Sequence, residues 1–198
     1  MTGLSFSFDD GPEPVWTERV LRELGSAEVR ATFFLIGERV LEHPQLAHAI
    51  VAAGHEVQLH CHRHVRHTEL SEAELIEDTR QGLGALASAR VSPQLWRAPW
   101  GEQTSASERV AQRFGLSLVR WSIDTHDWRG DTPAEMLAAA LPALAGGGAV
   151  LMHDGLGPGA RREGCENTVG LIGPLSSAAR ELGVAVGTLG EAESALAA

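Results

Sequence analysis

Lysine and tyrosine are absent from this sequence, so all 16 of its basic residues are arginines. Their absence excludes catalysis through a lysine Schiff base, phosphate binding by a P-loop lysine, and proton transfer by a tyrosine. The 2 cysteines form no C-x-x-C pair and are too few for a disulfide framework. Any enzymatic chemistry must therefore rest on Asp, Glu, His, Arg, Cys, Ser or a bound metal.

Positive charge and long apolar segments are also scarce. The formal net charge is −10, which argues against a nucleic acid or an anionic membrane as a partner. No apolar run approaches the roughly 20 residues of a membrane span. The N-terminal residues lack the pattern of a secretory signal, so we expect a cytoplasmic protein, or an extracellular one if a signal was trimmed from the chain. A monomer is the default expectation.

Segments with strand and helix patterns alternate along the 198 residues. Such alternation is typical of a parallel sheet whose two faces are covered by helices. We therefore expect an α/β fold, a distorted and incomplete barrel that forms a single domain over residues 1–198, with an open doubly wound sheet as the alternative. The strands are expected at 3–8, 31–36, 55–60, 94–99, 116–124, 149–153 and 184–189.

Acidic, basic and imidazole groups collect at the carboxyl ends of these predicted strands. In α/β barrels and in open α/β sheets, the active site is built at that end. Scattered surface charges would not favour one end of several strands, so this pattern indicates an enzyme. The residues are Asp9 and Asp10 after the first strand, His60 after the third, Arg97 after the fourth, Asp124 and Asp127 after the fifth, and His153 after the sixth.

Histidines are concentrated in the segment LHCHRH (59–64) and at His67 just beyond it. If the segment is extended, His60, His62 and His64 share one face. If it turns, His60 and His64 pair instead, because they are four residues apart. Neutral imidazoles with one carboxylate suit Zn²⁺ and leave one position open for water. A pH-sensing cluster is the alternative interpretation.

Other residues at the strand ends suggest acid and base roles. The adjacent side chains of Asp9 and Asp10 diverge, so one carboxylate can bind a metal while the other handles protons. Arg97 could hold Asp9 ionised through a charge-assisted hydrogen bond. A carboxylate near His153 would raise the pKa of that histidine and suit it to general acid catalysis. A thiol nucleophile at Cys61 is disfavoured, because no orienting constellation accompanies it.

Five short motifs occur in order along the chain: SFDDGP (7–12), HCHRH (60–64), RAPWG (97–101), DTHDW (124–128) and LMH (151–153). Together they resemble the motifs of the polysaccharide deacetylases with a NodB-type domain, carbohydrate esterase family 4. The resemblance extends from about residue 4 to about residue 190. It implies a distorted, TIM-like (β/α)7 barrel, in agreement with the strand pattern.

The resemblance also implies roles for the residues that match the motifs. Asp10, His60 and His64 would bind the metal, usually Zn²⁺, with Co²⁺ or Mn²⁺ as alternatives. Asp9 would be the general base that activates water, and Arg97 would orient Asp9.

On the other side of the predicted site, the resemblance makes His153 the general acid that protonates the leaving amine. Asp127 would tune His153, with Asp124 as the less favoured candidate. The remaining residues would shape the substrate pocket: Trp100, whose backbone N–H would stabilise the oxyanion and which replaces the family's usual tyrosine, together with Trp128 and Leu151.

The expected function is removal of N-acetyl groups from an amino sugar, oligosaccharide or polysaccharide by a metal-dependent hydrolase. Two alternatives remain open. One is a metal-dependent amidohydrolase that acts on a small non-carbohydrate amide. The other is an inactive barrel that binds glycans, which the presence of the chemical residues in all five motifs disfavours.

Overall fold

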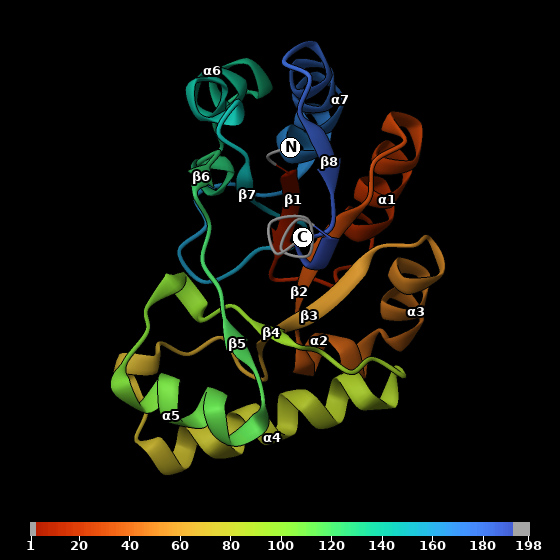
Figure 1. Cartoon of the computed structure of the whole chain (residues 1–198). Helices are drawn as coiled ribbons and strands as arrows, with labels where there is room; N and C mark the ends of the chain where they lie inside the picture. The colour runs from red at the N-terminus through yellow and green to blue at the C-terminus, as the bar shows by residue number, and fades with distance from the viewer. Residues whose placement is uncertain (1–2, 192–198) are drawn as a thin grey trace.

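The computed structural model describes residues 3–191, which form one curved sheet with helices packed against it (Figure 1). The strands are β1 (Gly3–Asp9), β2 (Ala31–Ile36), β3 (Glu56–Cys61), β4 (Leu95–Trp96), β5 (Ser117–Leu118), β6 (Ile123–Asp124), β7 (Gly148–His153) and β8 (Ala185–Gly187). The helices are α1 (Trp16–Ala27), α2 (Gly37–Glu42), α3 (Pro44–Ala52), α4 (Glu72–Ser88), α5 (Ser105–Phe114), α6 (Pro133–Leu144) and α7 (Glu166–Glu181). Three short 3-10 helices are η1 (His67–Glu69), η2 (Pro99–Gly101) and η3 (Asp127–Arg129).

All strand pairs in the sheet are parallel, and the strands follow the order β5-β4-β3-β2-β1-β7-β6. The short β8 pairs with residues 3–5 of β1. The two ends of this order, β5 and β6, are not hydrogen-bonded to each other, so the barrel stays open between them. The predicted α/β class and the distorted, incomplete barrel are confirmed. Within residues 3–191, no helix is both long and apolar enough to span a membrane.

The predicted strand 116–124 is the one element that the structure divides. Its first part pairs with β4, where the Val119 N–H donates to the Trp96 carbonyl. Its last part pairs with β7, where the Ser122 N–H donates to the Ala149 carbonyl. The chain changes partner in between, because it crosses the opening of the barrel. The single strand predicted there is therefore wrong, and two strands of two residues each, β5 and β6, replace it.

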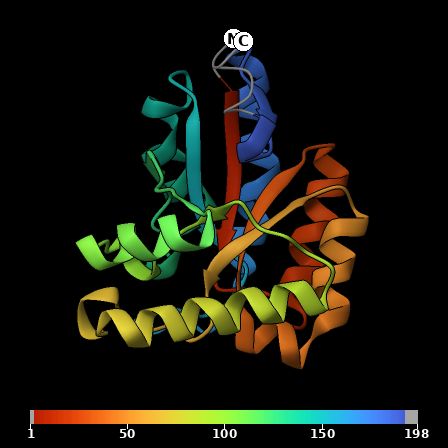
Figure 2. The ribbon, with the colours of Figure 1, turned by 60° about the horizontal axis from the view of Figure 1, so that its bottom comes forward.

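Helices α4 and α5 lie side by side in both views of the ribbon (Figure 1, Figure 2), and α4 also packs on β3. Strand β1 is buried on both faces, as expected for the centre of a parallel sheet. Phe6 and Phe8 pack in the main apolar cluster of the molecule. Ser7 and Asp9 point to the opposite face, because side chains alternate along a strand. That alternation places a buried carboxylate inside the barrel at the carboxyl end of β1.

The main apolar core should dominate the stability of the fold. Phe33 is fully buried, and its ring stacks on Phe8 with the centroids 5.1 Å apart. We predict that Phe33→Ala lowers the free energy of unfolding by about 3–5 kcal/mol, because it leaves a cavity. Urea unfolding measures this change. The control is Leu182→Ala, at a side chain that is 47% exposed. A Phe33 variant as stable as that control would contradict the assignment of the core.

Candidate active site and metal centre

The carboxyl ends of the parallel strands surround one pocket of about 400 Å³. Parallel strands direct their carboxyl ends to the same edge, so side chains distant in sequence meet there. The predicted site residues that line the pocket are Asp9, Asp10, His60, His64, Trp100, Asp124, Trp128, Leu151 and His153. Arg97 and Asp127 lie behind this lining and are completely buried. The structure therefore brings together every residue to which the five motifs assign a role.

The predicted metal ligands form a compact cluster. Oδ1 of Asp10 lies 3.3 Å from Nε2 of His60 and 3.2 Å from Nε2 of His64. One ligand atom from each of the three residues lies within 4.8 Å of the others. Asp10 and His60 are only 4% and 2% exposed. A carboxylate and two imidazoles in this arrangement match the ligand set of a catalytic zinc site with one position left for water.

The orientation of the His60 ring provides an independent test of whether a cation fits. Nδ1 of His60 lies 2.7 Å from the carbonyl oxygen of Arg97, which can only accept a hydrogen bond. Nδ1 must therefore carry the proton, and in the neutral ring Nε2 presents a lone pair. That lone pair faces the Asp10 carboxylate. Two buried acceptors face each other stably only when a cation lies between them or a proton is added, so the residues fit a metal.

The electrostatics of the cluster agree with this interpretation. Burial alone would raise the pKa of Asp10, but the adjacent imidazoles of His60 and His64 hold it well below its ordinary value. Burial would lower the pKa of His60, but the charges of Asp9 and Asp10 raise it. The cluster thus keeps a negative charge and attracts a positive one.

A turn after β3 brings His64 back beside His60. Asp78 of α4 holds this turn, because its carboxylate accepts from the backbone N–H of His62 at 2.8 Å and of Arg63 at 3.0 Å. One helical turn further on, a Cβ at Gly82 would lie 2.8 Å from Cδ1 of Leu59 and 3.3 Å from the His62 nitrogen, so a side chain there would crowd the approach of the helix to this turn. Neither of these α4 residues was predicted from the sequence. Their signal was a glycine inside a helix, four residues after an aspartate.

His62 is not part of the ligand cluster. Its ring lies against Gly37 of α2, where an added Cβ would be 2.6 Å from Nδ1. Its Nδ1 is buried and has no hydrogen-bond partner among the described residues. His67 is buried as well, beside Ser107 and Trp96, and burial lowers its pKa to about 4. Of the two geometries that the segment allowed, the structure has the turn that pairs His60 with His64.

Asp9 is held by the fully buried Arg97. Nη1 of Arg97 donates to Oδ1 of Asp9 at 2.8 Å and to Oγ of Ser7 at 2.8 Å. The guanidinium also stacks on the Phe34 ring, 4.0 Å from its centroid. These contacts fix the carboxylate of Asp9 and neutralise its buried charge. Arg97 therefore supports two parts of the pocket. Its carbonyl orients the metal ligand His60, and its side chain orients Asp9.

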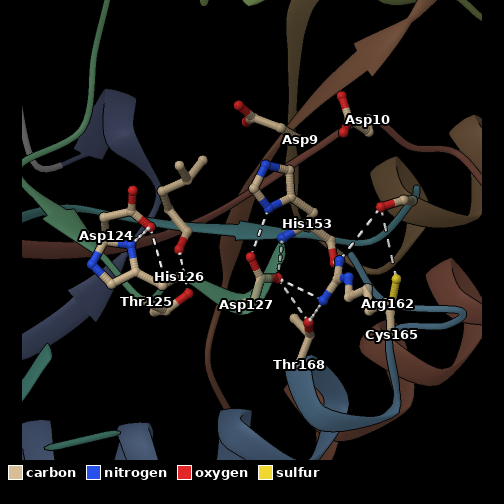
Figure 3. A network of polar contacts seen from close by, with 12 residues as sticks. Asp9, Asp10, Asp124, Thr125, His126, Asp127, His153, Arg162, Cys165 and Thr168 are labelled. Carbon is tan, nitrogen blue, oxygen red and sulfur yellow. Dashed lines mark hydrogen bonds and ion pairs between the residues drawn. The ribbon is translucent and has the colours of Figure 1, made fainter. Parts of the chain in front are cut away.

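His153 at the end of β7 pairs with Asp127. Nδ1 of His153 donates to Oδ1 of Asp127 at 2.7 Å, and Figure 3 shows the ring with Asp127 on one side and the Asp9–Asp10 pair on the other. Burial alone would lower the pKa of His153, but the charge and hydrogen bond of Asp127 raise it to about 9. Burial would likewise raise the pKa of Asp127, but its charged and hydroxyl partners lower it. The pair is thus a buried imidazolium and carboxylate at neutral pH.

The structure distinguishes between the two aspartates that were candidates to contact His153. Asp124 lines the pocket, but its Oδ1 accepts from the backbone N–H of His126 at 2.7 Å and lies 3.2 Å from Nδ1 of the same residue. It shapes the backbone before η3, whereas Asp127 contacts His153 directly (Figure 3).

Two partners of Asp127 were missed by the sequence analysis. Arg162 and Thr168 both donate to Oδ2 of Asp127, at 3.0 Å and 2.7 Å (Figure 3). They come from the loop after β7 and from α7. The basic, glycine-rich composition of residues 153–168 was the only sequence signal for them.

Aromatic and aliphatic side chains form the pocket walls. Trp100 has φ 53°, in the left-handed region, and its ring lies edge-on to His64 with the centroids 4.2 Å apart. The guanidinium of Arg66 stacks on the Trp100 ring, 4.0 Å from the ring centroid. Arg66 and Trp121 also line the pocket, and neither was predicted to do so.

Neither cysteine is suited to nucleophilic catalysis. Cys61 is 2% exposed, and burial raises the pKa of its thiol well above the ordinary value. Cys165 is completely buried, and burial raises its pKa to about 12. Both thiols therefore stay protonated and unreactive, as the sequence analysis expected for Cys61.

Comparison with known proteins agrees with the fold and with the family that the motifs resemble. The family model described as polysaccharide deacetylase matches residues 3–119. A chitooligosaccharide deacetylase from Bradyrhizobium sp. (strain ANU 289) is 37% identical over 158 residues, which cover 79% of this chain and 72% of that protein. A peptidoglycan-N-acetylglucosamine deacetylase from Bacillus cereus is 32% identical over 154 residues, covering 77% of this chain and 72% of the relative. A solved family 4 carbohydrate esterase from Streptomyces lividans, in complex with acetate, has a TM-score of 0.84 at 28% identity and covers 94% of this chain and 92% of that chain.

The geometry predicts which histidines are needed for metal binding. After Zn²⁺ loading and removal of free ions, His60→Gln and His64→Gln should each lose most of the bound metal, because each removes one of three ligands. His62→Gln is the matched control and should keep it. Elemental mass spectrometry measures the metal content of each variant. Loss of metal in the His62 variant would instead support the extended strand with three ligands.

Proposed function

Because the chain belongs to the polysaccharide deacetylase family, we propose that it is a metal-dependent hydrolase that removes N-acetyl groups from an amino sugar or oligosaccharide. One observation carries the proposal. A candidate metal cluster, an Asp–Arg pair and a His–Asp pair converge on a single pocket from separate strands. Hydrolysis of an amide needs a polarised carbonyl, a base for water and an acid for the leaving amine, and these three groups fit those needs.

Asp10, His60 and His64 would hold the metal, and their donor set favours Zn²⁺, with Co²⁺ or Mn²⁺ as alternatives. A divalent cation bound there would supply Lewis acidity, which polarises the amide carbonyl and makes water more acidic. Arg97 contributes by fixing the tautomer of His60, since its carbonyl receives the Nδ1 proton.

Asp9 is the proposed general base. Arg97 occupies Oδ1 of Asp9, and within residues 3–191 no hydrogen bond reaches Oδ2. Oδ2 is thus free to accept a proton from the attacking water. The paired guanidinium fixes the direction of the carboxylate, so the base is oriented before substrate arrives.

His153 is the proposed general acid. Its Nδ1 proton is committed to Asp127, so Nε2 carries the proton that is transferred to the leaving amine. The raised pKa of about 9 keeps the ring protonated at neutral pH. A group that must donate a proton benefits from this, whereas a general base would not.

Leu151 and Trp128 are proposed to enclose the acetyl methyl, because both line the pocket near His153. The backbone N–H of Trp100 is the proposed donor to the oxyanion. The tryptophan rings at the pocket offer flat apolar faces on which a sugar ring can stack.

The proposed substrate is an oligosaccharide of N-acetylglucosamine, by analogy with the chitooligosaccharide and peptidoglycan deacetylases that the chain resembles. We predict that the Zn²⁺-loaded protein releases acetate from such oligomers and that a chelator abolishes the release. An enzymatic acetate assay measures it. Turnover of small amides without acetate release from any glycan would favour the alternative amidohydrolase. Failure on both substrate classes would favour the inactive glycan-binding barrel.

Substitutions of the two adjacent aspartates, Asp9 and Asp10, should have different effects on metal content and turnover. Asp9→Asn should keep the metal but lower kcat by about 100-fold or more, because the general base is lost. Asp10→Ala should lose the metal, because a ligand is removed. The control is Asp131→Asn, which makes the same chemical change outside the pocket. Equal metal content in the Asp10 variant and the wild type would contradict this division of roles.

A further inference from the structure

The loop between β7 and α7 sends a buried arginine into the site. The side chain of Arg162 is only 5% exposed. Its Nη1 donates to Oδ2 of Asp127 at 3.0 Å and makes a second, short hydrogen bond to Oγ1 of Thr168. Its Nη2 donates to the carbonyl oxygens of His153 at 3.2 Å and Gly155 at 3.5 Å. Figure 3 shows this guanidinium next to the Asp127 carboxylate, on the side away from the His153 ring.

The contacts divide the two oxygens of Asp127 between separate tasks. Oδ2 receives Arg162 at 3.0 Å and the Thr168 hydroxyl at 2.7 Å. It also accepts from the backbone N–H of His153 at 2.9 Å. Oδ1 is left for the His153 ring, at 2.7 Å. With three donors on one oxygen, the carboxylate cannot rotate without breaking several hydrogen bonds, so the orientation of Oδ1 is fixed.

The Arg162 guanidinium also holds in place the segment of the pocket wall that follows β7. Its hydrogen bonds to the His153 and Gly155 carbonyls hold the first residues of the loop. An added Cβ at Gly155 would lie 2.7 Å from the Asp10 carbonyl oxygen, so this loop passes directly over the residue that carries the metal ligand. Next to Arg162, the Arg161 N–H donates to the Trp128 carbonyl at 2.8 Å, which joins the loop to η3.

We propose that Arg162 is a positioning residue that fixes Asp127 so that His153 holds its proton and its orientation for transfer to the leaving amine. The role in catalysis rests on the proposed function, whereas the effect on the His153 ring does not. A lysine at this place could supply the charge, but its three donors are too few for the four acceptors that the guanidinium bonds, which are the Asp127 carboxylate, the Thr168 hydroxyl and two carbonyls. Arg162 thus acts through Asp127 and does not touch the reacting atoms.

Removing Arg162 should release Asp127. The carboxylate then loses one of the three donors to Oδ2, which loosens its hydrogen bond to the His153 ring, whereas the loss of the guanidinium charge by itself acts in the opposite direction and raises the pKa of His153. The other charges that face His153, those of Asp9 and Asp10, remain. Arg162→Lys keeps the charge and removes only the fixed geometry, so in this variant the pKa of His153 should fall from about 9 toward the ordinary histidine value of about 6.5.

The experiment compares the wild type with Arg162→Met, Arg162→Lys and the control Arg109→Met. Arg109 forms an exposed ion pair with Glu72, so its variant also removes an arginine from a carboxylate, but far from the pocket in α5. NMR titration of 15N-labelled histidine rings gives the pKa of His153, with His153→Gln to assign the signal. Metal content, kcat and KM are measured on the same Zn²⁺-loaded samples.

The Met variant should keep its metal and lower kcat by about 10- to 100-fold with KM little changed. The Lys variant should keep the charge yet titrate His153 at lower pH, and the Arg109 control should match the wild type. If Arg162→Met is unstable, the Lys variant and Thr168→Val, which removes one donor to Asp127, provide the same test.

An unchanged His153 titration in the Lys variant would overturn the proposal, and so would a shift of that titration to higher pH. The titration needs no turnover, so it separates this inference from the proposed function. A lowered His153 pKa in a protein that releases no acetate would support the positioning role and refute the deacetylase.

Discussion

The contact between Oδ1 of Asp10 and Nε2 of His60 is the interaction on which the site depends. Because the Arg97 carbonyl takes the Nδ1 proton of His60, the ring presents an acceptor to a carboxylate inside a buried cluster. Such a pair needs positive charge between its members. His64 completes a set of three ligand atoms, and a metal cation can bind all three at once, which a single proton cannot. Asp9 and His153 then take the proposed roles of general base and general acid beside that cation.

The fold brings these atoms together through long-range supports. Arg97 joins the ends of β4 and β1, since its side chain binds Ser7 and Asp9 while its carbonyl orients His60. Asp78 holds the turn that returns His64 to the cluster. On the opposite side, Arg162 secures Asp127 behind His153. Each functional side chain is thus fixed by a buried partner from a different element, as preorganised sites require.

Much of this was predictable from the sequence, for a physical reason. Strand periodicity and the polar residues at strand ends are local signals, and the five motifs kept their order, so the barrel and the pocket residues could be named in advance. The division of 116–124 could not be predicted, because its two halves differ only in whether their partner is β4 or β7. Asp78, Arg162 and Thr168 were missed for the same reason. The groups that they hold in the site lie 15 to 41 residues away, and the local signals near them in sequence do not identify those partners.

The most direct test of the account is anomalous diffraction from crystals of the Zn²⁺-loaded protein. The account predicts one strong peak at about 2.0–2.2 Å from Oδ1 of Asp10 and from Nε2 of both His60 and His64. The His60 ring should keep its Nδ1 on the Arg97 carbonyl. A peak at another group, such as Asp124 with His126, or the absence of any peak in the cluster, would contradict it.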